Sequence, residues 1–106
     1  MPNYIDMESG LKRVGGSAAL YKKLLLKFVD GNYQDQLETL INDGNIADAT
    51  SMAHTIKGVA ANLSLMEVNA LALQIEQALK NGEEYAHLVP QLRAASDATV
   101  AEIQAM

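Results

Sequence analysis

Residues 53–63 of the chain read AHTIKGVAANL, and their spacing predicts a helix. Small or aliphatic residues recur every three or four positions through this stretch and the turns before it, as on the buried face of an amphipathic helix. The members of this apolar stripe are Ile46, Ala49, Ala53, Ile56, Ala60 and Leu63. We therefore expect a helix from about Asn45, as its cap, to Leu63.

The outer face of this helix carries a histidine with unusual neighbours. Successive residues are separated by about 100° around a helix axis, so His54 points away from the stripe that contains Ala53. Lys57 lies at i+3, Gly58 at i+4 and Ala61 at i+7, so a cation and two very small residues flank the imidazole. Glycine inside a helix costs about 1 kcal/mol relative to alanine, and no turn is needed here. This pattern indicates a surface that another protein approaches closely.

A solvent-facing imidazole beside a lysine suits a nucleophile that carries phosphate. The reference pKa of histidine is about 6.5, which leaves a free lone pair near pH 7. Phosphoryl transfer requires mainly positioning and charge neutralisation. We expect Nε2 of His54 to accept the phosphoryl group and Lys57 to attract its oxygens. The residues expected to contact the partner protein are Gly58, Ala61, Thr50 and Ser51.

A carboxylate of the following helix can reach this histidine. His54 precedes Leu63 by nine residues and Glu76 follows it by thirteen, so a chain reversal at Ser64 puts both at similar heights on antiparallel helices. Side chains tilt toward the N-terminus of their own helix, which narrows the gap. Glu76 could accept a hydrogen bond from His54 Nδ1–H and so select the tautomer. Alternatively, it could simply pair with Lys80 at i+4.

The motif A-H-x-[aliphatic]-K-G-x-A-x-x-[aliphatic] in residues 53–63 resembles the histidine-containing phosphotransfer (HPt) domains of bacterial phosphorelays. Segments 20–25 and 75–80 look like the flanking helices of that family, so the resemblance covers roughly residues 5–82. It implies a phosphoryl group carried on His54 and exchanged with receiver domains. Members of the family often have a carboxylate or an amide where Glu76 stands, and more often have glycine where Ser64 stands.

The remaining periodicities predict an all-α fold, an antiparallel up-down four-helix bundle with a short additional N-terminal helix. Residues 5–14 are expected to form that short helix, with Asp6 as its cap and Gly15-Gly16-Ser17 as its end. Apolar spacing continues across Gly31 and favours one long helix over residues 17–42, capped by Ser17 and kinked at most. A true break at residues 30–32 is the alternative.

The second half of the chain predicts two more helices. Ser64 and Glu67 have the spacing of a capping box, which would start a helix that ends at Asn81-Gly82. Glu83 and Glu84 suit the first turn of a last helix. Pro90 is tolerated only near a helix start, so residues 83–87 are either part of that helix or an irregular turn before it.

Composition narrows the class of protein. The 106 residues, 49% of them hydrophobic, fit one domain spanning 1–106. A formal net charge of −5 argues against a nucleic-acid surface. The sequence contains no run of membrane-spanning length, and residues 1–4 are no signal peptide. The absence of cysteine excludes thiol chemistry and fits a cytoplasmic location. The distant His54 and His87 make a poor metal site, so no metal is expected.

The leading hypothesis is a phosphorelay intermediate of a two-component system. His54 would receive a phosphoryl group from the aspartate of one receiver domain and pass it reversibly to the aspartate of a second. A hybrid sensor histidine kinase is a further expected partner. The chain is not expected to be an enzyme, since no Gly-rich nucleotide loop is present. We expect a monomer without a cofactor, any Mg²⁺ belonging to the receiver. Two alternatives are a substrate domain phosphorylated directly by a kinase's ATP-binding domain, and a helical interaction module without phosphotransfer.

Overall fold

The computed structural model describes residues 4–106, and its regular structure is helical throughout. The helices are α1 (Met7–Arg13), α2 (Ala18–Asp30), α3 (Tyr33–Asn42), α4 (Ile46–Leu63), α5 (Met66–Asn81) and α6 (Leu88–Gln104). The prediction of an all-α fold is confirmed. Among these helices, none combines the length and the apolar character needed to cross a membrane.

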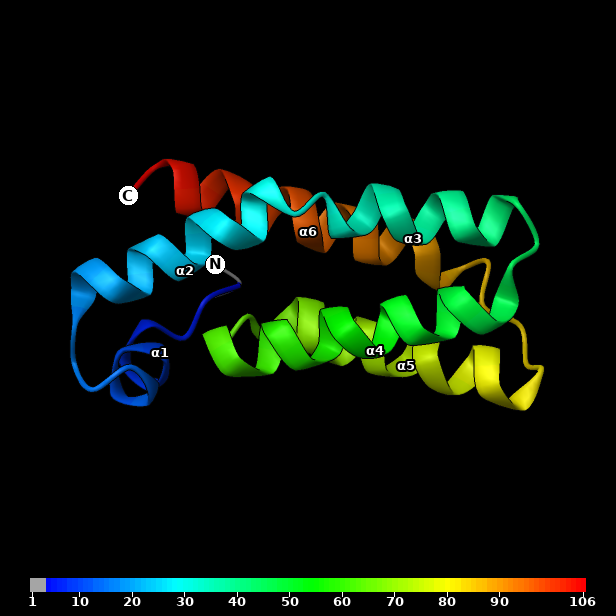
Figure 1. Ribbon diagram of the computed structural model, residues 1–106, viewed down its shortest axis with the longest axis horizontal. Helices are drawn as coiled ribbons and strands as arrows, with labels where there is room; N and C mark the ends of the chain where they lie inside the picture. Colours follow the sequence, from blue (N-terminus) through cyan, green and yellow to red (C-terminus); the bar gives the residue numbers. More distant parts are fainter. Residues whose placement is uncertain (1–3) are drawn as a thin grey trace.

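Helices α2 to α6 lie along the long axis of a molecule that measures 40 × 23 × 22 Å, and the short α1 lies at one end (Figure 1). In Figure 1, α2 and α3 follow one another along the top, α4 runs back, α5 runs out again and α6 returns. Helices α4 and α5 pack closely against each other, α3 packs on α4, and α6 packs on α5. The buried face of α4 is the predicted stripe from Ala49 to Leu63, whereas Ile46, which was predicted to belong to it, is exposed at the start of the helix.

The single helix predicted over residues 17–42 is wrong, because the chain breaks between α2 and α3. Asn32 has a φ of 50°, in the left-handed region, which Asn tolerates better than most residues. The Gln36 side chain donates to the Gly31 carbonyl at 2.6 Å, so a carbonyl at the end of α2 is satisfied. Apolar spacing continues across the break because Phe28 and Leu37 enter the same core. Apolar periodicity therefore shows which face of a segment is buried. It does not show whether the helical backbone hydrogen bonds continue through that segment.

The capping box predicted at Ser64 is also wrong. Ser64 is the C-cap of α4 with a φ of 58°, and Leu65 precedes α5 without any side-chain cap. The Ser64 hydroxyl instead donates to Ser9 Oγ at 3.0 Å. Two backbone hydrogen bonds, of 2.9 and 3.0 Å, join residues 4–6 to residues 64–66. The N-terminal segment therefore closes this turn, in the place where a local capping box was expected.

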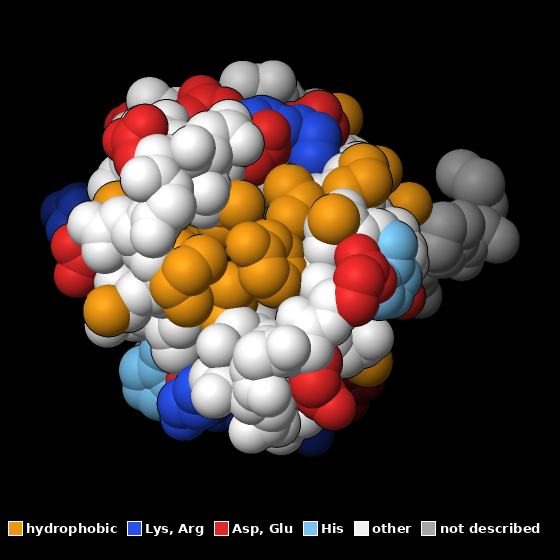
Figure 2. All heavy atoms as spheres, turned by 90° about the vertical axis from the view of Figure 1, so that its right-hand side faces the viewer, with side chains coloured by type: hydrophobic (Ala, Val, Ile, Leu, Met, Phe, Trp, Pro, Cys, Tyr) orange, Lys and Arg blue, Asp and Glu red, His pale blue; other side chains and the backbone are white. Residues whose placement is uncertain are grey.

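The starts of α1, α2 and α4 follow their sequence signals. The side chains of Asp6, Ser17 and Asn45 accept hydrogen bonds from backbone N–H groups three residues later, as predicted for caps. Residues 83–87 are irregular, and α6 begins only at Leu88, with Pro90 in its first turn. The placement of Glu83 and Glu84 in the first turn of the last helix is therefore wrong: both precede α6, because proline is compatible only with a first turn and Pro90 requires a later start. The connection over residues 83–87 lies at the end of the molecule that Figure 2 shows, where hydrophobic side chains gather at the centre.

Tyr21 joins α1 and α2 to the end of α4. Its side chain is buried, and its hydroxyl donates to the Leu63 carbonyl at 2.5 Å. Gly10 of α1 lies directly on the ring, since a Cβ at this position would be 2.2 Å from Cζ and from the hydroxyl oxygen. The ring cannot easily shift because its hydroxyl is held by α4. Gly10 is therefore required by a close approach, without any unusual backbone angle.

We predict that Gly10→Ala lowers the free energy of unfolding by about 1–3 kcal/mol, since the added methyl overpacks a fixed ring. Urea denaturation measures the change. Gly58→Ala in α4 is the matched control, because a Cβ there would meet no atom of the described residues within 4 Å. That variant should be as stable as the wild type or more stable, through improved helix propensity. Equal stability of Gly10→Ala and the wild type would contradict the close packing at Tyr21.

Candidate functional site

His54 stands near the middle of α4 with 64% of its side chain exposed. Its chain neighbours on the inner face, Ala53 and Ile56, are almost wholly buried. The helical period therefore turns the imidazole outward, at the position that the apolar stripe predicted.

Glu76 of α5 lies beneath the histidine and binds it directly. Only 4% of the Glu76 side chain is exposed, and its Oε2 is 2.7 Å from His54 Nδ1. The Nζ of Lys57 is 2.9 Å from the other oxygen, Oε1. Lys80 approaches Oε2 to 3.6 Å from its own helix. The contact predicted from helical heights is present, and so is the i+4 pair with Lys80, so the two readings of Glu76 are compatible.

This arrangement selects one form of the imidazole. Burial by itself raises the pKa of Glu76, but the hydrogen bonds from Lys57 and His54 outweigh it and hold the pKa below its ordinary value of 4.5. Glu76 is therefore ionised near neutral pH and acts only as an acceptor. The hydrogen consequently lies on Nδ1, and in the neutral imidazole Nε2 carries the free lone pair toward solvent.

On the side of Gly58, no side chain projects from the surface next to His54. A Cβ at Gly58 would meet no atom within 4 Å in the described part of the chain, so this glycine serves no close helix packing there. Ala61 and Ser51 are exposed. Thr50 is half-buried, and its hydroxyl donates to the Ile46 carbonyl at 2.8 Å, so it is engaged by its own helix. The partner-contact role of these four residues stays a prediction.

Sequence reasoning missed Asn69, which braces the site from α5. Its amide donates to the Lys57 carbonyl at 3.0 Å, one turn beyond the histidine. Asn69 lies seven residues before Glu76, two turns along the same helix face. That spacing of two polar residues toward α4 was the available signal. It also missed that Lys57 would be held by Glu76, because only the packed helices bring those side chains together.

Metal binding has no support in residues 4–106, where no three His, Cys, Asp or Glu side chains are grouped to hold an ion. His87, the second histidine, pairs with Glu84 on an exposed turn far along the chain from His54. The groups that the structure brings together at His54 are one imidazole, one buried carboxylate and two lysines.

The site is thus one exposed histidine, held by a buried carboxylate on a bundle of helices. The family model described as Hpt domain matches residues 31–106, and the chain belongs to this family. Hpt domains take part in histidine phosphotransfer in phosphorelays, as phosphocarrier modules rather than catalysts. The match starts at the break before α3, so α1, α2 and the resemblance at residues 20–25 lie outside it. Comparisons with curated proteins and with solved structures gave no match.

The lowered pKa of Glu76 predicts how stability depends on pH. Its folded pKa lies below its unfolded pKa, so its ionisation stabilises the fold fully above the unfolded value of 4.5, and this contribution is lost as the pH falls through the folded value. Between about pH 5 and about pH 3, urea midpoints of the wild type should fall more steeply than those of Glu76→Gln. Glu102→Gln, an exposed carboxylate on α6, is the control and should keep the wild-type slope. Parallel curves for the wild type and Glu76→Gln would contradict the prediction.

Proposed function

We propose that this domain is a phosphorelay intermediate whose His54 exchanges a phosphoryl group reversibly with the aspartates of receiver domains. The observation that supports it best is the hydrogen bond from His54 Nδ1 to the buried Glu76 carboxylate, 2.7 Å long, below a ring that is 64% exposed. Because Nδ1 is bound to Glu76, Nε2 of the exposed ring is the nitrogen that a docked protein can reach.

The transfer step follows from the tautomer. Nε2 attacks the phosphorus of an aspartyl phosphate, the N–P bond forms, and the bond between phosphorus and the aspartate oxygen breaks, so the receiver carboxylate leaves. Because Nδ1 keeps its hydrogen, the phosphorylated imidazole carries a positive charge. Glu76 is ionised and lies against Nδ1, so it stabilises that charge. In the reverse direction the N–P bond at Nε2 breaks as the phosphoryl group moves to an aspartate oxygen, and the imidazole becomes neutral again with its hydrogen on Nδ1.

Lys57 has a double role in this proposal. Its ammonium has three N–H donors, and Glu76 Oε1 takes one of them at 2.9 Å. With 28% of its side chain exposed, Lys57 keeps donors for the phosphoryl oxygens. It therefore balances the carboxylate before transfer and attracts the phosphate during it.

The remaining features of the proposal concern the whole domain. We take α2 and α3 as one interrupted rod, which makes the chain a single antiparallel up-down four-helix bundle with α1 as the short extra helix, supported by the helix directions in Figure 1. The domain acts as a cytoplasmic monomer without a cofactor of its own, and Mg²⁺ belongs to the receiver. A hybrid sensor histidine kinase is the expected source of phosphate.

His54→Gln tests the proposal. We expect this variant to bind receivers but to take no acid-labile phosphate from a panel of phosphorylated receiver domains, since its amide cannot serve as the nucleophile. His87→Gln is the matched control and should accept phosphate as the wild type does. Phosphate on the His54→Gln protein would contradict the proposal. Labelling by an isolated kinase ATP-binding domain, and none by receivers, would favour the substrate-domain alternative.

Gly58→Leu tests whether the partner protein needs the space that the missing side chain at Gly58 leaves beside His54. Because the position has open space around it, the variant should fold normally by circular dichroism, while its rate of phosphotransfer falls about tenfold or more through steric exclusion of the receiver. Gly58→Ala is the control, with a much smaller loss expected. A Leu variant that relays phosphate at the wild-type rate would show that no partner approaches this face closely.

A further inference from the structure

Lys80 approaches the histidine site from the side opposite to Lys57. Helix α4 runs toward the α4–α5 turn and α5 runs away from it (Figure 1), so Lys57 lies nearer the turn than His54. Lys80 lies farther from the turn than Glu76. Side chains of a helix lean toward its N-terminus. Both lysines therefore lean back toward the pair of imidazole and carboxylate, one from each direction along the bundle axis.

The two lysines are held differently. Lys57 Nζ is 2.9 Å from Glu76 Oε1, the length of a charge-assisted hydrogen bond. Lys80 Nζ is 3.6 Å from Oε2, too far for such a bond, and that oxygen already binds His54 Nδ1 at 2.7 Å. The side chain of Lys80 is 60% exposed, against 28% for Lys57. Lys80 is therefore the ammonium that can leave the carboxylate without breaking a hydrogen bond to it.

A phosphoryl group on His54 is within reach of Lys80. Both side chains contact the same oxygen of Glu76, so the ammonium lies no farther from Nδ1 than these two contacts together span. A phosphorus atom on Nε2 lies just across the ring from Nδ1. The flexible four-carbon stem of lysine lets the ammonium cover that remaining distance.

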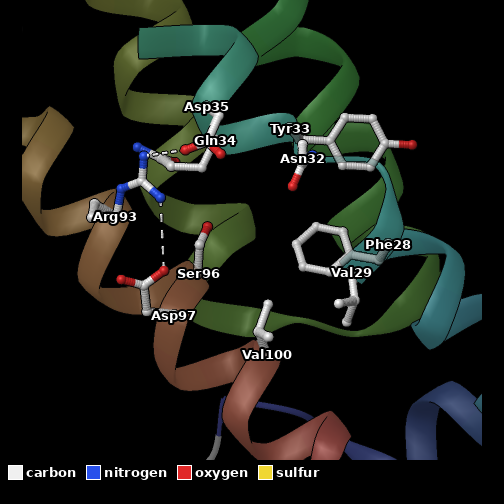
Figure 3. A pocket seen from close by; sticks show the side chains of 10 residues that line it. All are labelled: Phe28, Val29, Asn32, Tyr33, Gln34, Asp35, Arg93, Ser96, Asp97 and Val100. Atoms are coloured by element: carbon white, nitrogen blue, oxygen red, sulfur yellow. Dashed lines mark hydrogen bonds and ion pairs between the residues drawn. The ribbon is translucent and has the colours of Figure 1, made fainter.

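Arg93, the remaining cation outside α1 and α2, is committed elsewhere. Figure 3 shows its guanidinium paired with Asp35 of α3 and Asp97 of α6. Its Nε also donates to Glu38 Oε2 at 2.8 Å. In the part of the chain that the structure describes, the cations that contact the carboxylate beneath His54 are therefore the two lysines.

The charge balance of the phosphorylated site favours a role for both lysines. Before transfer, the neutral imidazole, the ionised Glu76 and two ammonium groups sum to one positive charge, which attracts an anionic donor. A phosphoryl group brings about two negative charges at pH 7, and the imidazole becomes cationic. With both lysines the phosphorylated site is then neutral. With Lys57 alone it would keep one uncompensated negative charge.

We propose that Lys80 is a second phosphate-binding residue of this site, an inference that rests on the proposed function. When Nε2 of His54 carries the phosphoryl group, the Lys80 ammonium leaves Glu76 Oε2 and donates to a phosphoryl oxygen. Lys57 keeps its hydrogen bond to Oε1 and adds a donor from the other side. The motif in residues 53–63 contains only Lys57, so the contribution of Lys80 comes from the packing of α5 on α4.

Phosphoramidate tests Lys80 without a partner protein, because it gives its phosphoryl group directly to a nucleophilic imidazole. Read as the ³¹P signal that His54→Gln lacks, phosphorylation of Lys80→Met should be about threefold to tenfold slower than that of the wild type. Lys80→Arg keeps the charge and should restore most of the rate. Lys12→Met is the matched control, since Lys12 is also 3.6 Å from a glutamate four residues earlier, and should react normally. A wild-type rate in Lys80→Met overturns the proposal.

The ³¹P signal also shows whether the ammonium meets the phosphate. A cation at the phosphoryl oxygens favours the dianion, so its removal raises the pH at which the phosphoryl group takes up a proton. The midpoint of the ³¹P titration should rise by about 0.2 to 0.7 pH units in Lys80→Met and stay unchanged in Lys12→Met. Equal midpoints in Lys80→Met and the wild type overturn the proposal.

Urea denaturation separates the two lysines. Lys57→Met should lower the urea midpoint, because the buried Glu76 loses a hydrogen bond, whereas Lys80→Met should keep it, because an exposed ion pair contributes little. Equal losses in both variants would overturn the division of roles.

The relay proposal and the role of Lys80 fail in different ways. Phosphorylation of the wild type by phosphoramidate but by no receiver domain would contradict the relay proposal, and a slow Lys80→Met would still support the role of Lys80. Normal transfer from receivers, with a wild-type rate in Lys80→Met, would contradict the role of Lys80 alone. No phosphorylation of the wild type by either donor would overturn both.

Discussion

The pairing of the Glu76 carboxylate with side chains of α4 is the interaction on which the geometry of the site depends. A carboxylate with 4% of its side chain exposed is costly unless it is paired and hydrogen-bonded. Here His54 and Lys57 satisfy one oxygen each, at 2.7 and 2.9 Å. Because these contacts join α4 to α5, the requirement that stabilises the helix pair also orients the imidazole. Structure and chemistry at this site therefore share one group.

That pairing needs α4 and α5 in one register, and the turn between them sets it. Ser64 takes a left-handed conformation, and two backbone hydrogen bonds join residues 4–6 to residues 64–66. Tyr21 holds the last carbonyl of α4 from the side of α2. These contacts come from the N-terminal part of the chain, outside residues 31–106 that the Hpt domain model matches. The N-terminal segment thus helps to fix the α4–α5 turn, and with it the register in which Glu76 lies beside His54.

Under the proposed function, the electrostatics of the site suit a phosphoryl group carried on His54. A neutral imidazole with its hydrogen on Nδ1 leaves Nε2 free, and phosphorylation there makes the ring cationic above an ionised carboxylate. The surface beyond the ring is low at Gly58, where a side chain would meet nothing within 4 Å among the described residues. Under the proposed function, the phosphate-activating groups come from the docked receiver, and the domain contributes position and charge.

Some features could be predicted because they depend only on neighbours along the chain. The caps at Asp6, Ser17 and Asn45 are local hydrogen bonds, and the outward direction of His54 follows from the helical period. Even the contact between His54 and Glu76 could be predicted. The rise per residue of two antiparallel helices, joined by one chain reversal, puts both side chains at similar heights. The break at Gly31-Asn32 could not, because residues on both sides of it face the same core and the apolar spacing continues.

The sequence by itself therefore determined the helical class, the helix starts capped by Asp6, Ser17 and Asn45, and the exposed histidine, all of which depend on separations of a few residues. Only the tertiary structure decided that Ser64 would bend the chain without capping α5, that Lys57 would bind Glu76, and that Arg93 would join α3 to α6. The reason is that each of these depends on groups that packing alone brings together, such as Arg93 and Glu38, which are 55 residues apart in the chain.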